Sequence, residues 1–347
     1  MTFPQASQTT VGAVGPAASS RRRSLAELLT TPGMTSVVIG ASKDTNAKVT
    51  VMLVPSGGDR PVLAVKAATT ATAAAVVKGE QDLLVALHQR IGNATVQATI
   101  PRVIESVEFQ GHAAMVVTAL PGTPMFTSYH RWRHTARPCS VAADFAAFAV
   151  WLERFQDATA GPPPPIHMGR GNIGRLQERF ADEPDIAVMI DRLDAVHDRL
   201  GRSHTIRTAV HGDLWQGNLL LSDGRISGVV DWEAGAISGE PLRDLVRFPL
   251  MYALYLDRHT RSGRGVAGHP GLRAGTWGAG VDYAVDGAGW FPELFRRFLR
   301  DGLVRLGATP DCWRDLVLCG IADVAATTDD QQFGRRHLQL FRRLSRP

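Results

Sequence analysis

The chain has 347 residues, 44% of them hydrophobic, which is enough for one sizeable core or for two smaller cores packed together. It contains no uninterrupted apolar run of about 18 residues and no charged start followed by an apolar stretch, so we expect a cytoplasmic protein without a membrane span or secretory signal. The net charge of +5 is modest and the basic residues are not interleaved with aromatic ones, so a nucleic-acid partner is not expected.

The N-terminal third reads as a tail followed by a small sheet-forming lobe. Residues 1–24 are rich in Ser, Thr, Ala, Gly and Pro without hydrophobic periodicity, which predicts a disordered tail. Residues 25–120 combine one helix, at about Thr72–Arg90, with short β-type runs. These runs predict strands at Val37–Ile39, Val49–Val54, Val62–Ala67, Val103–Phe109 and Ala113–Val117. The pattern favours a small antiparallel sheet with one helix.

The remainder of the chain, residues 121–347, is predicted to be a larger and mainly helical lobe. Helical periodicity begins near Val141 and is interrupted at Pro162–Pro165 and by a short β segment between Ile206 and Trp232. A short connection at Leu120-Pro121-Gly122 joins the two lobes. We therefore predict an α+β protein of two lobes.

The three cysteines do not indicate a disulfide framework or a metal site. Their number is odd, and no two of them have the spacing of a metal-binding pair. We expect Cys139, Cys312 and Cys319 to be buried apolar residues.

The strongest chemical signal is the segment His211-Gly212-Asp213-Leu214-Trp215-Gln216-Gly217-Asn218, a glycine-containing loop with an acid and an amide. The pair Asp223-Gly224 follows it and favours a two-residue hairpin turn before the apolar strand Ile226–Val230. With that pair at the turn, Asn218 faces Val229, and Asp231 lies two residues further on. The hairpin therefore predicts that Asn218 and Asp231 lie close together.

These side chains have the chemistry that phosphoryl transfer requires. Mg²⁺ prefers hard oxygen ligands, so Asn218 and Asp231 could hold a magnesium ion that is also bound to phosphate. Asp213, at the start of the loop, is then free to accept the proton of an attacking hydroxyl. Each residue alone could instead cap a turn or end a strand, but the ordered set favours the functional interpretation.

The loop and the segment Val230-Asp231-Trp232-Glu233 together resemble the aminoglycoside phosphotransferase and choline kinase family. The resemblance implies a protein-kinase-like fold, with Asp213 as catalytic base, Asn218 and Asp231 as magnesium ligands and His211 as a brace for the loop. Gly212 stands where protein kinases usually carry arginine, which favours a small-molecule acceptor. The segment Gly239-Glu240-Pro241-Leu242-Arg243-Asp244-Leu245 also resembles the family, and we expect Asp244 to be a buried anchor for the loop backbone.

An ATP clamp is predicted in the small lobe. Only four of the 38 basic residues are lysines, and Lys66 lies in the predicted third strand. A lone strand lysine often protects a sheet edge, but its rarity here favours phosphate binding. Glu80 emerges from an apolar helical stripe and should point inward, whereas Asp82 lies on a polar face. We predict a Lys66–Glu80 ion pair that orients the lysine toward the α- and β-phosphates of ATP.

Two further nucleotide contacts are implied by position and by the resemblance. The loop Ile39–Lys48 has one glycine rather than a glycine triad, so the hydroxyls of Ser42 and Thr45 and nearby backbone amides are expected to contact phosphate. The segment Met115–Gly122 resembles the family's hinge, so the backbone of Thr118, Ala119 and Leu120 would meet the adenine edge.

The predicted function is transfer of the γ-phosphate of ATP, with Mg²⁺, to a hydroxyl of a small molecule such as an aminoglycoside-like antibiotic, a sugar or an amino alcohol. An arginine excess in the last third of the chain lowers the expectation of a polycationic aminoglycoside. The alternative is an inactive pseudokinase that binds a nucleotide or a partner, although the intact set of motif residues argues against it. The sequence indicates neither the oligomeric state nor a preference for ATP over GTP.

Overall fold

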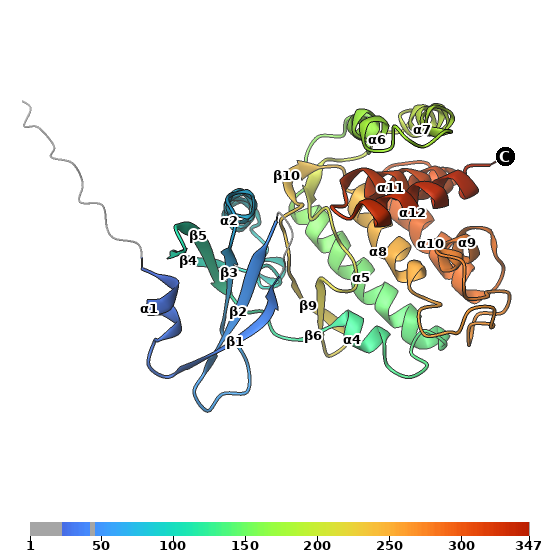
Figure 1. Ribbon diagram of the computed structural model, residues 1–347. Coiled ribbons are helices and arrows are strands. Elements are labelled where there is room, and N and C mark those ends of the chain that lie inside the picture. The colour runs from blue at the N-terminus through green and yellow to red at the C-terminus, as the bar shows by residue number, and fades with distance from the viewer. Residues whose placement is uncertain (1–22, 42–45, 347) are drawn as a thin grey trace, which may run out of the picture.

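The computed structural model describes residues 23–41 and 46–346 as two lobes of different architecture (Figure 1). A five-stranded sheet forms the N-terminal lobe, and helices dominate the C-terminal lobe. This arrangement confirms the predicted α+β fold class, with a small sheet lobe and a larger helical lobe.

All neighbouring strands of the N-terminal sheet are antiparallel, in the order β1-β2-β3-β5-β4. Helix α2 contacts β3 and β5 and buries Val77, Leu84 and Leu87. The alternation of apolar residues along the strands gives the sheet one face for this packing. The bounds are β1 (Met34–Ala41), β2 (Lys48–Pro55), β3 (Leu63–Ala68), α2 (Ala71–Arg90), α3 (Ala94–Gln97), β4 (Val103–Phe109) and β5 (His112–Thr118).

The lobe begins with a short helix, α1 (Leu25–Leu29), that the sequence analysis missed. Ser24, which we assigned to the tail, caps this helix: its hydroxyl accepts from the Glu27 N–H, and the Glu27 carboxylate accepts from the Ser24 N–H. The Arg23 carbonyl also accepts a hydrogen bond from the Glu108 N–H of β4. The Ser-x-x-Glu signature of a capping box could have revealed this start.

The C-terminal lobe packs long helices around an aromatic core. Phe148 of α5 stacks on Phe248 of α8 at 4.0 Å between ring centroids, and both are fully buried. Burying one such side chain stabilises the fold by about 1.5–3 kcal/mol. The bounds are β6 (Thr123–Pro124), α4 (Met125–Tyr129), α5 (Pro138–Ala158), η1 (Arg170–Asn172), α6 (Ile173–Arg179), α7 (Ile186–Leu200), β7 (Thr208–Val210), β8 (Leu219–Ser222), β9 (Arg225–Val229), β10 (Ala236–Gly239), α8 (Leu242–Leu254), α9 (Ala279–Asp286), α10 (Trp290–Arg305), η2 (Pro310–Cys312), α11 (Trp313–Thr327) and α12 (Gln331–Leu344).

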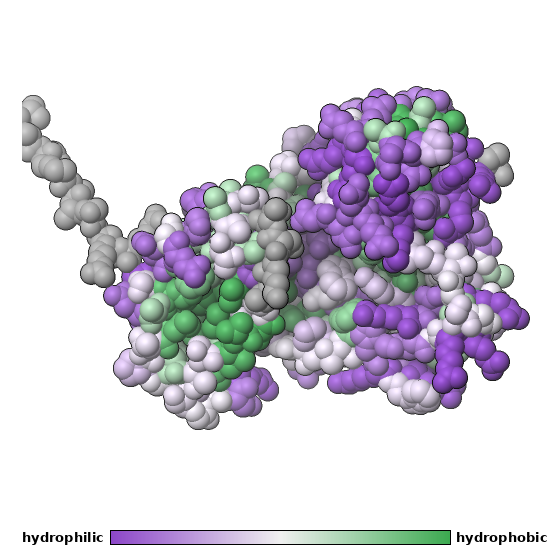
Figure 2. Space-filling model, viewed as in Figure 1, coloured by the Kyte–Doolittle hydropathy of each residue, from purple (hydrophilic) through white to green (hydrophobic). Residues whose placement is uncertain are grey.

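The surface of the two lobes differs in character (Figure 2). Apolar residues gather over the N-terminal sheet, where Val37, Val38 and Ile39 of β1 are exposed, whereas much of the helical lobe in this view is polar. Among the helices of the described residues, none combines the length and apolarity needed to cross a membrane.

The prediction for the cysteines is correct for only one of the three. Cys319 is buried in α11, Cys312 is half-buried, and Cys139 is exposed at the start of α5. Cys139 lies in the first turn of its helix and is exposed there, so apolar character alone did not bury it.

Candidate active site

A compact group of charges joins the two lobes at Lys66. Its ammonium group donates to both carboxylate oxygens of Glu80, at 2.8 and 2.7 Å, and to Asp231 Oδ1 at 2.6 Å. Lys66 lies on β3, between β2 and β5, which excludes the edge-protecting role. The predicted Lys66–Glu80 pair is therefore present, and it extends to Asp231 of the other lobe.

The pKa values of this group reflect the pairing. Burial by itself would lower the pKa of Lys66, but the carboxylates of Glu80 and Asp231 outweigh burial and raise it. Burial likewise would raise the pKa of Asp231, but the Lys66 ammonium holds it below its usual range. Both side chains are therefore charged at neutral pH.

Glu80 also fixes the backbone beside Asp231. Its carboxylate accepts a hydrogen bond from the Trp232 N–H at 3.0 Å, and the side chain is only 3% exposed. Asp231 itself has a φ of +68°, a left-handed conformation that aspartate tolerates better than most residues. Asp82, two residues beyond Glu80, is exposed and pairs with Lys78, as its polar face predicted.

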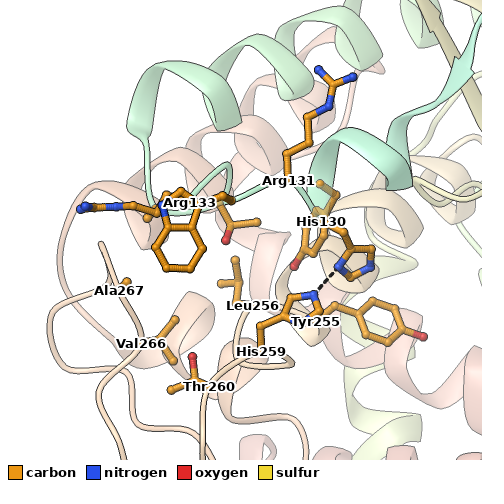
Figure 3. A pocket seen from close by; sticks show the side chains of 13 residues that line it. His130, Arg131, Arg133, Tyr255, Leu256, His259, Thr260, Val266 and Ala267 are labelled. Atoms are coloured by element: carbon orange, nitrogen blue, oxygen red, sulfur yellow. Dashed lines mark hydrogen bonds between the residues drawn. The ribbon is translucent and has the colours of Figure 1, made fainter.

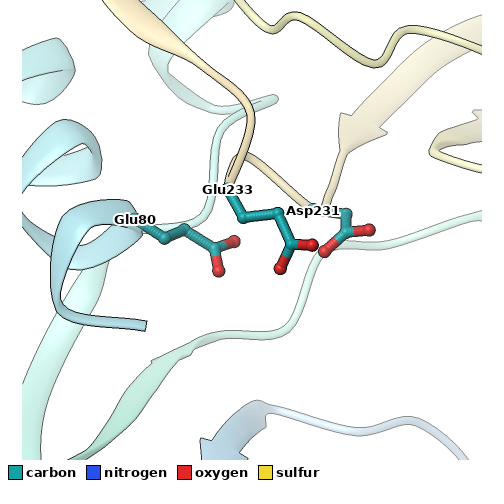
Figure 4. A group of neighbouring side chains, drawn as sticks. All are labelled: Glu80, Asp231 and Glu233. Carbon is teal, nitrogen blue, oxygen red and sulfur yellow. The ribbon is translucent and has the colours of Figure 1, made fainter. Parts of the chain in front are cut away.

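A third carboxylate, Glu233, lies beside Glu80 and Asp231, and sequence reasoning assigned it no role. One oxygen from each of the three residues lies within 4.8 Å of the others, and Figure 4 shows the carboxylates gathered at one place. Glu233 also forms an ion pair with Lys48 of β2. Its position two residues after Asp231 is the sequence signal that could have identified Glu233 as part of this group.

The loop that begins at His211 is anchored from beneath by Asp244 of α8. The two Asp244 oxygens accept the backbone N–H groups of His211 and Gly212, at 2.7 and 2.8 Å, as predicted for a buried anchor. Burial raises the pKa of Asp244, and His211 and the two N–H donors oppose this shift. Gly212 has a φ of +82°, and a Cβ there would lie 2.2 Å from the Ala234 carbonyl oxygen, so a side chain is excluded.

His211 braces the loop, as expected. Its Nδ1 accepts from the Asp213 N–H at 3.2 Å, so its Nε2 carries the hydrogen and donates to the Val230 carbonyl at 2.9 Å. The imidazole thereby ties the loop to the segment that carries Asp231.

Asp213 is held by an arginine that the sequence analysis did not consider. Arg247 of α8 donates through Nε and Nη2 to Asp213 Oδ1, at 3.0 and 2.5 Å. Asn218 Nδ2 donates to the Asp213 carbonyl at 3.0 Å and lies 3.4 Å from Oδ2. Arg247 is three residues beyond Asp244 on one helix, so helical spacing could have placed both under the loop.

The hairpin register differs by one residue from the prediction. Asp223-Gly224 forms the turn, with φ of +51° and +72°, and Ser222 pairs with Arg225. A bulge then shifts the ladder, so that Leu219 rather than Asn218 pairs with Val229, and the predicted pairing is wrong. The extra residue is Ser227, whose hydroxyl donates to the Pro121 carbonyl at 2.6 Å.

The bulge nevertheless keeps Asn218 next to the Asp231 segment. The Val230 N–H donates to the Asn218 carbonyl at 3.0 Å, and Asp231 is the next residue. Asn218 is 7% exposed, with its amide nitrogen turned to Asp213, so its amide oxygen is the atom available for a cation.

The remaining predicted nucleotide contacts are only partly described. Ser42 and Thr45 lie outside the described residues. In the hinge, the Thr118 N–H donates to the Arg102 carbonyl and the Ala119 N–H to the Val62 carbonyl, so the sheet already uses both. Leu120 packs against Gly228 of β9, where an added Cβ would lie 2.8 Å from the Leu120 Cβ. If one of these three residues contacts adenine through its backbone N–H, that residue is therefore Leu120.

Aromatic residues connect the loop from His211 to Asn218 with a cavity of about 820 Å³ in the helical lobe. Trp215 lies 5.4 Å from Phe126 and 6.3 Å from Tyr255, measured between ring centroids. The Phe126 N–H also donates to the Gln216 carbonyl of the loop at 2.9 Å. Tyr255 lines the cavity, which therefore lies beside the loop that carries Asp213.

Several solved structures with the same fold are phosphotransferases. The apo form of a thermostable mutant of aminoglycoside phosphotransferase APH(4)-Ia has a TM-score of 0.56 at 11% identity, over 92% of this chain and 97% of that chain. Its ternary complex with ADP and hygromycin B (D198A variant) scores 0.53 at 11% identity, over 89% and 92%. Macrolide 2'-phosphotransferase MphH from Brachybacterium faecium scores 0.51 at 14% identity, over 92% and 96%. At these identities the likeness establishes the two-lobed, protein-kinase-like fold.

A comparison with curated protein sequences finds no match. The model of the phosphotransferase enzyme family, in contrast, matches residues 49–276, which is well over half of the chain and includes Lys66, the loop from His211 to Asn218, and Asp231. The chain therefore belongs to the phosphotransferase enzyme family.

Proposed function

We propose that this protein transfers the γ-phosphate of ATP to a hydroxyl group of a small molecule. Lys66, oriented by Glu80, would contact the α- and β-phosphates, and Asp213 would act as the base. The observation that carries the proposal is the Lys66–Glu80–Asp231 group, because it places a charged lysine and a charged carboxylate together between the lobes.

The donor atoms near Asp231 fit a magnesium ion. Asp231 pairs with Lys66 through Oδ1, and the Asn218 amide donates through its nitrogen. Within the described residues, Asp231 Oδ2 and the Asn218 amide oxygen therefore remain available as ligands, one from a carboxylate and one neutral. Glu233 adds a second carboxylate within reach. A magnesium ion held by Asn218 and Asp231 would neutralise phosphate charge during transfer.

Asp213 is positioned to take a proton from one side only. Arg247 occupies Oδ1, and Oδ2 has only the long 3.4 Å contact from Asn218 within the described residues. The acceptor hydroxyl would donate to Oδ2, which aligns its oxygen for attack on the γ-phosphorus. As the new O–P bond forms, the bond from the γ-phosphorus to the β,γ-bridging oxygen would break, ADP would leave, and Oδ2 would receive the hydroxyl proton. Asp244 and His211 hold the loop backbone, so the carboxylate position is fixed before the acceptor binds.

The same residues argue for an active enzyme over a pseudokinase. A protein that only binds nucleotide needs no base, whereas Asp213 is held by two N–H donors of Arg247 while one oxygen remains open. The solved neighbours act on an aminoglycoside or a macrolide by their descriptions, which supports a small hydroxylated acceptor here as well.

Calorimetric titration of ATP with and without Mg²⁺ tests the nucleotide site. We expect Mg²⁺ to tighten ATP binding to the parent and to have little effect on Asp231→Ala. Asp82→Ala, which removes an exposed carboxylate of equal charge, is the matched control and should behave as the parent does. If Asp231→Ala binds Mg-ATP as tightly as the parent and retains turnover in an ADP-release assay over hydroxylated compounds, the assignment is wrong.

A further inference from the structure

The cavity beside the catalytic loop has walls from two distant segments of the chain (Figure 3). One wall is Tyr129–Ala136, at and after the end of α4, and the other is formed by residues between Tyr255 and Ala267, after α8. His130 Nδ1 and His259 Nε2 lie 2.6 Å apart and link the two walls by a hydrogen bond. A volume of about 820 Å³ is within the range that accommodates a drug-sized molecule.

The two lining residues of this cavity that always carry a charge, Arg131 and Arg133, are both positive. Figure 3 shows both side chains extending outward from the cavity, whereas none of the described lining residues is acidic. Of the acidic side chains nearby, Asp144 accepts hydrogen bonds from His134 and Tyr252, and Asp257 from the Gly275 N–H. Neither of them lines the cavity.

The aromatic rings at this place do not form a cation site. Aromatic faces attract cations, but a cation is already present, because the guanidinium of Arg258 lies 5.8 Å from the Phe126 ring centre and 5.5 Å from that of Tyr255. An ammonium group of a ligand would meet this arginine at the same rings. Burial also lowers the pKa of His130, with His259 and Arg258 adding to the shift, so a further positive charge is disfavoured there.

Apolar and aromatic surface is the other property of the cavity. Leu256 and Val266 are buried in its walls, while Trp132, which also lines the cavity, is 86% exposed. An indole that exposed offers a flat face on which a ring can stack. The lining thus combines stacking surface with positive charge.

We propose that this cavity binds the acceptor, and that the acceptor is a hydroxyl compound with an apolar or aromatic ring and a neutral or negative charge, not a polycationic amino sugar or an amino alcohol. This inference rests on the proposed phosphotransfer, since it assigns the acceptor of that reaction. Trp215, which touches both Phe126 and Tyr255, would place such a ring next to Asp213.

Three probes that differ only at carbon 6 test the charge preference: phenyl β-D-glucoside, its anionic glucuronide and its cationic 6-amino-6-deoxy analogue. Calorimetry in the presence of Mg²⁺ and a non-hydrolysable ATP analogue should show the neutral and anionic probes binding at least about 10-fold more tightly than the cationic one. The doubly substituted Arg131→Glu/Arg133→Glu protein should reverse the order of the charged probes. Arg60→Glu/Arg336→Glu, on exposed arginines elsewhere, should keep the parental order.

Two further variants locate the binding. Trp132→Ala should weaken all three probes by a similar factor, because it removes stacking surface and no charge. Arg131→Glu alone, with its melting temperature checked, covers the case in which substitution at Arg133, whose φ is +56°, disturbs the fold.

The inference is overturned if the cationic probe binds as tightly as the others, if charge reversal leaves the order unchanged, or if no probe binds at millimolar concentration. The binding of Mg-ATP and its loss in Asp231→Ala do not depend on this cavity. Failure of the acceptor inference with intact Mg-ATP binding would therefore leave the proposed phosphotransfer standing. If the probes bind as expected but Asp231→Ala binds Mg-ATP as the parent does, the proposed phosphotransfer fails, and the cavity is a ligand site that no longer has the role of acceptor site.

Discussion

Polar groups have opposite environments where the two lobes meet and in the interior of the helical lobe. Where the lobes meet, Lys66 is paired with Glu80 of its own lobe and with Asp231 of the other lobe. In the helical lobe, burial lowers the pKa of His197, His269 and His337, which keeps these imidazoles neutral. The difference teaches that pairing maintains the charges of Lys66 and Asp231, whereas burial of the imidazoles disfavours their charged form.

The largest effect is expected at the border of the two regions, at Asp213. Asp213→Asn retains the shape of the side chain but removes the base, so turnover should fall by about 10²–10⁴ while Mg-ATP affinity stays near that of the parent. Steady-state kinetics with an identified acceptor and calorimetry with ATP measure the two quantities. Parental turnover of this variant would mean that the loop is structural and would revive the pseudokinase interpretation.

The ion pair of Lys66 and Glu80 should act as one functional unit in catalysis. In a double-mutant cycle with Lys66→Ala and Glu80→Ala, the losses in kcat/KM should be non-additive, with a coupling of about 1–3 kcal/mol. The reason is that Glu80 orients Lys66 and also holds the Trp232 N–H. Asp82→Ala, on the exposed face of the same helix, should show no coupling to Lys66→Ala. Additive losses would contradict a direct functional pair.

Arg247 links the two regions that are compared, because it lies on α8 of the helical lobe and pairs with Asp213. Arg247→Met should lower kcat by roughly 10-fold and leave KM for ATP nearly unchanged, since one side-chain hydrogen-bonded ion pair is lost. Arg247→Lys should recover only part of the loss, because an ammonium cannot make the two-pronged contact to Asp213 Oδ1. A change confined to KM for ATP would show that Arg247 has another role.

An effect on stability and not on catalysis is expected from His337, within the helical lobe. Burial lowers its pKa from about 6.5 to about 3, so between these values the unfolded chain binds a proton that the folded chain does not. Stability should therefore fall as the pH decreases through 6.5, by about 2 kcal/mol between pH 8 and pH 5. Denaturant unfolding of His337→Leu should show a weaker pH dependence in this interval, whereas His204→Leu, at an exposed position, should not. Equal pH dependence in the parent and His337→Leu would refute this assignment.

The amino-acid sequence alone predicted the features that depend on neighbouring residues. The order of Asp213, Asn218 and Asp231 lies within 19 consecutive residues, and the turn at Asp223-Gly224 follows from residues that tolerate positive φ. Lys66 and Glu80 were paired by strand and helix periodicity, and the structure contains that ion pair. Local spacing sufficed because each of these elements is stabilised by its own pattern.

Tertiary contacts alone decided the rest. Arg247 reaches Asp213 because Asp244 fixes α8 beneath the loop, and the bulge at Ser227 forms where β9 meets the hinge at Pro121. The cavity needs the packing of Phe126, Trp215 and Tyr255, which lie far apart in the chain. No local preference encodes such contacts, because their energy is gained only when the separate segments pack together, and so the shape and charge of the cavity emerge only in the folded protein.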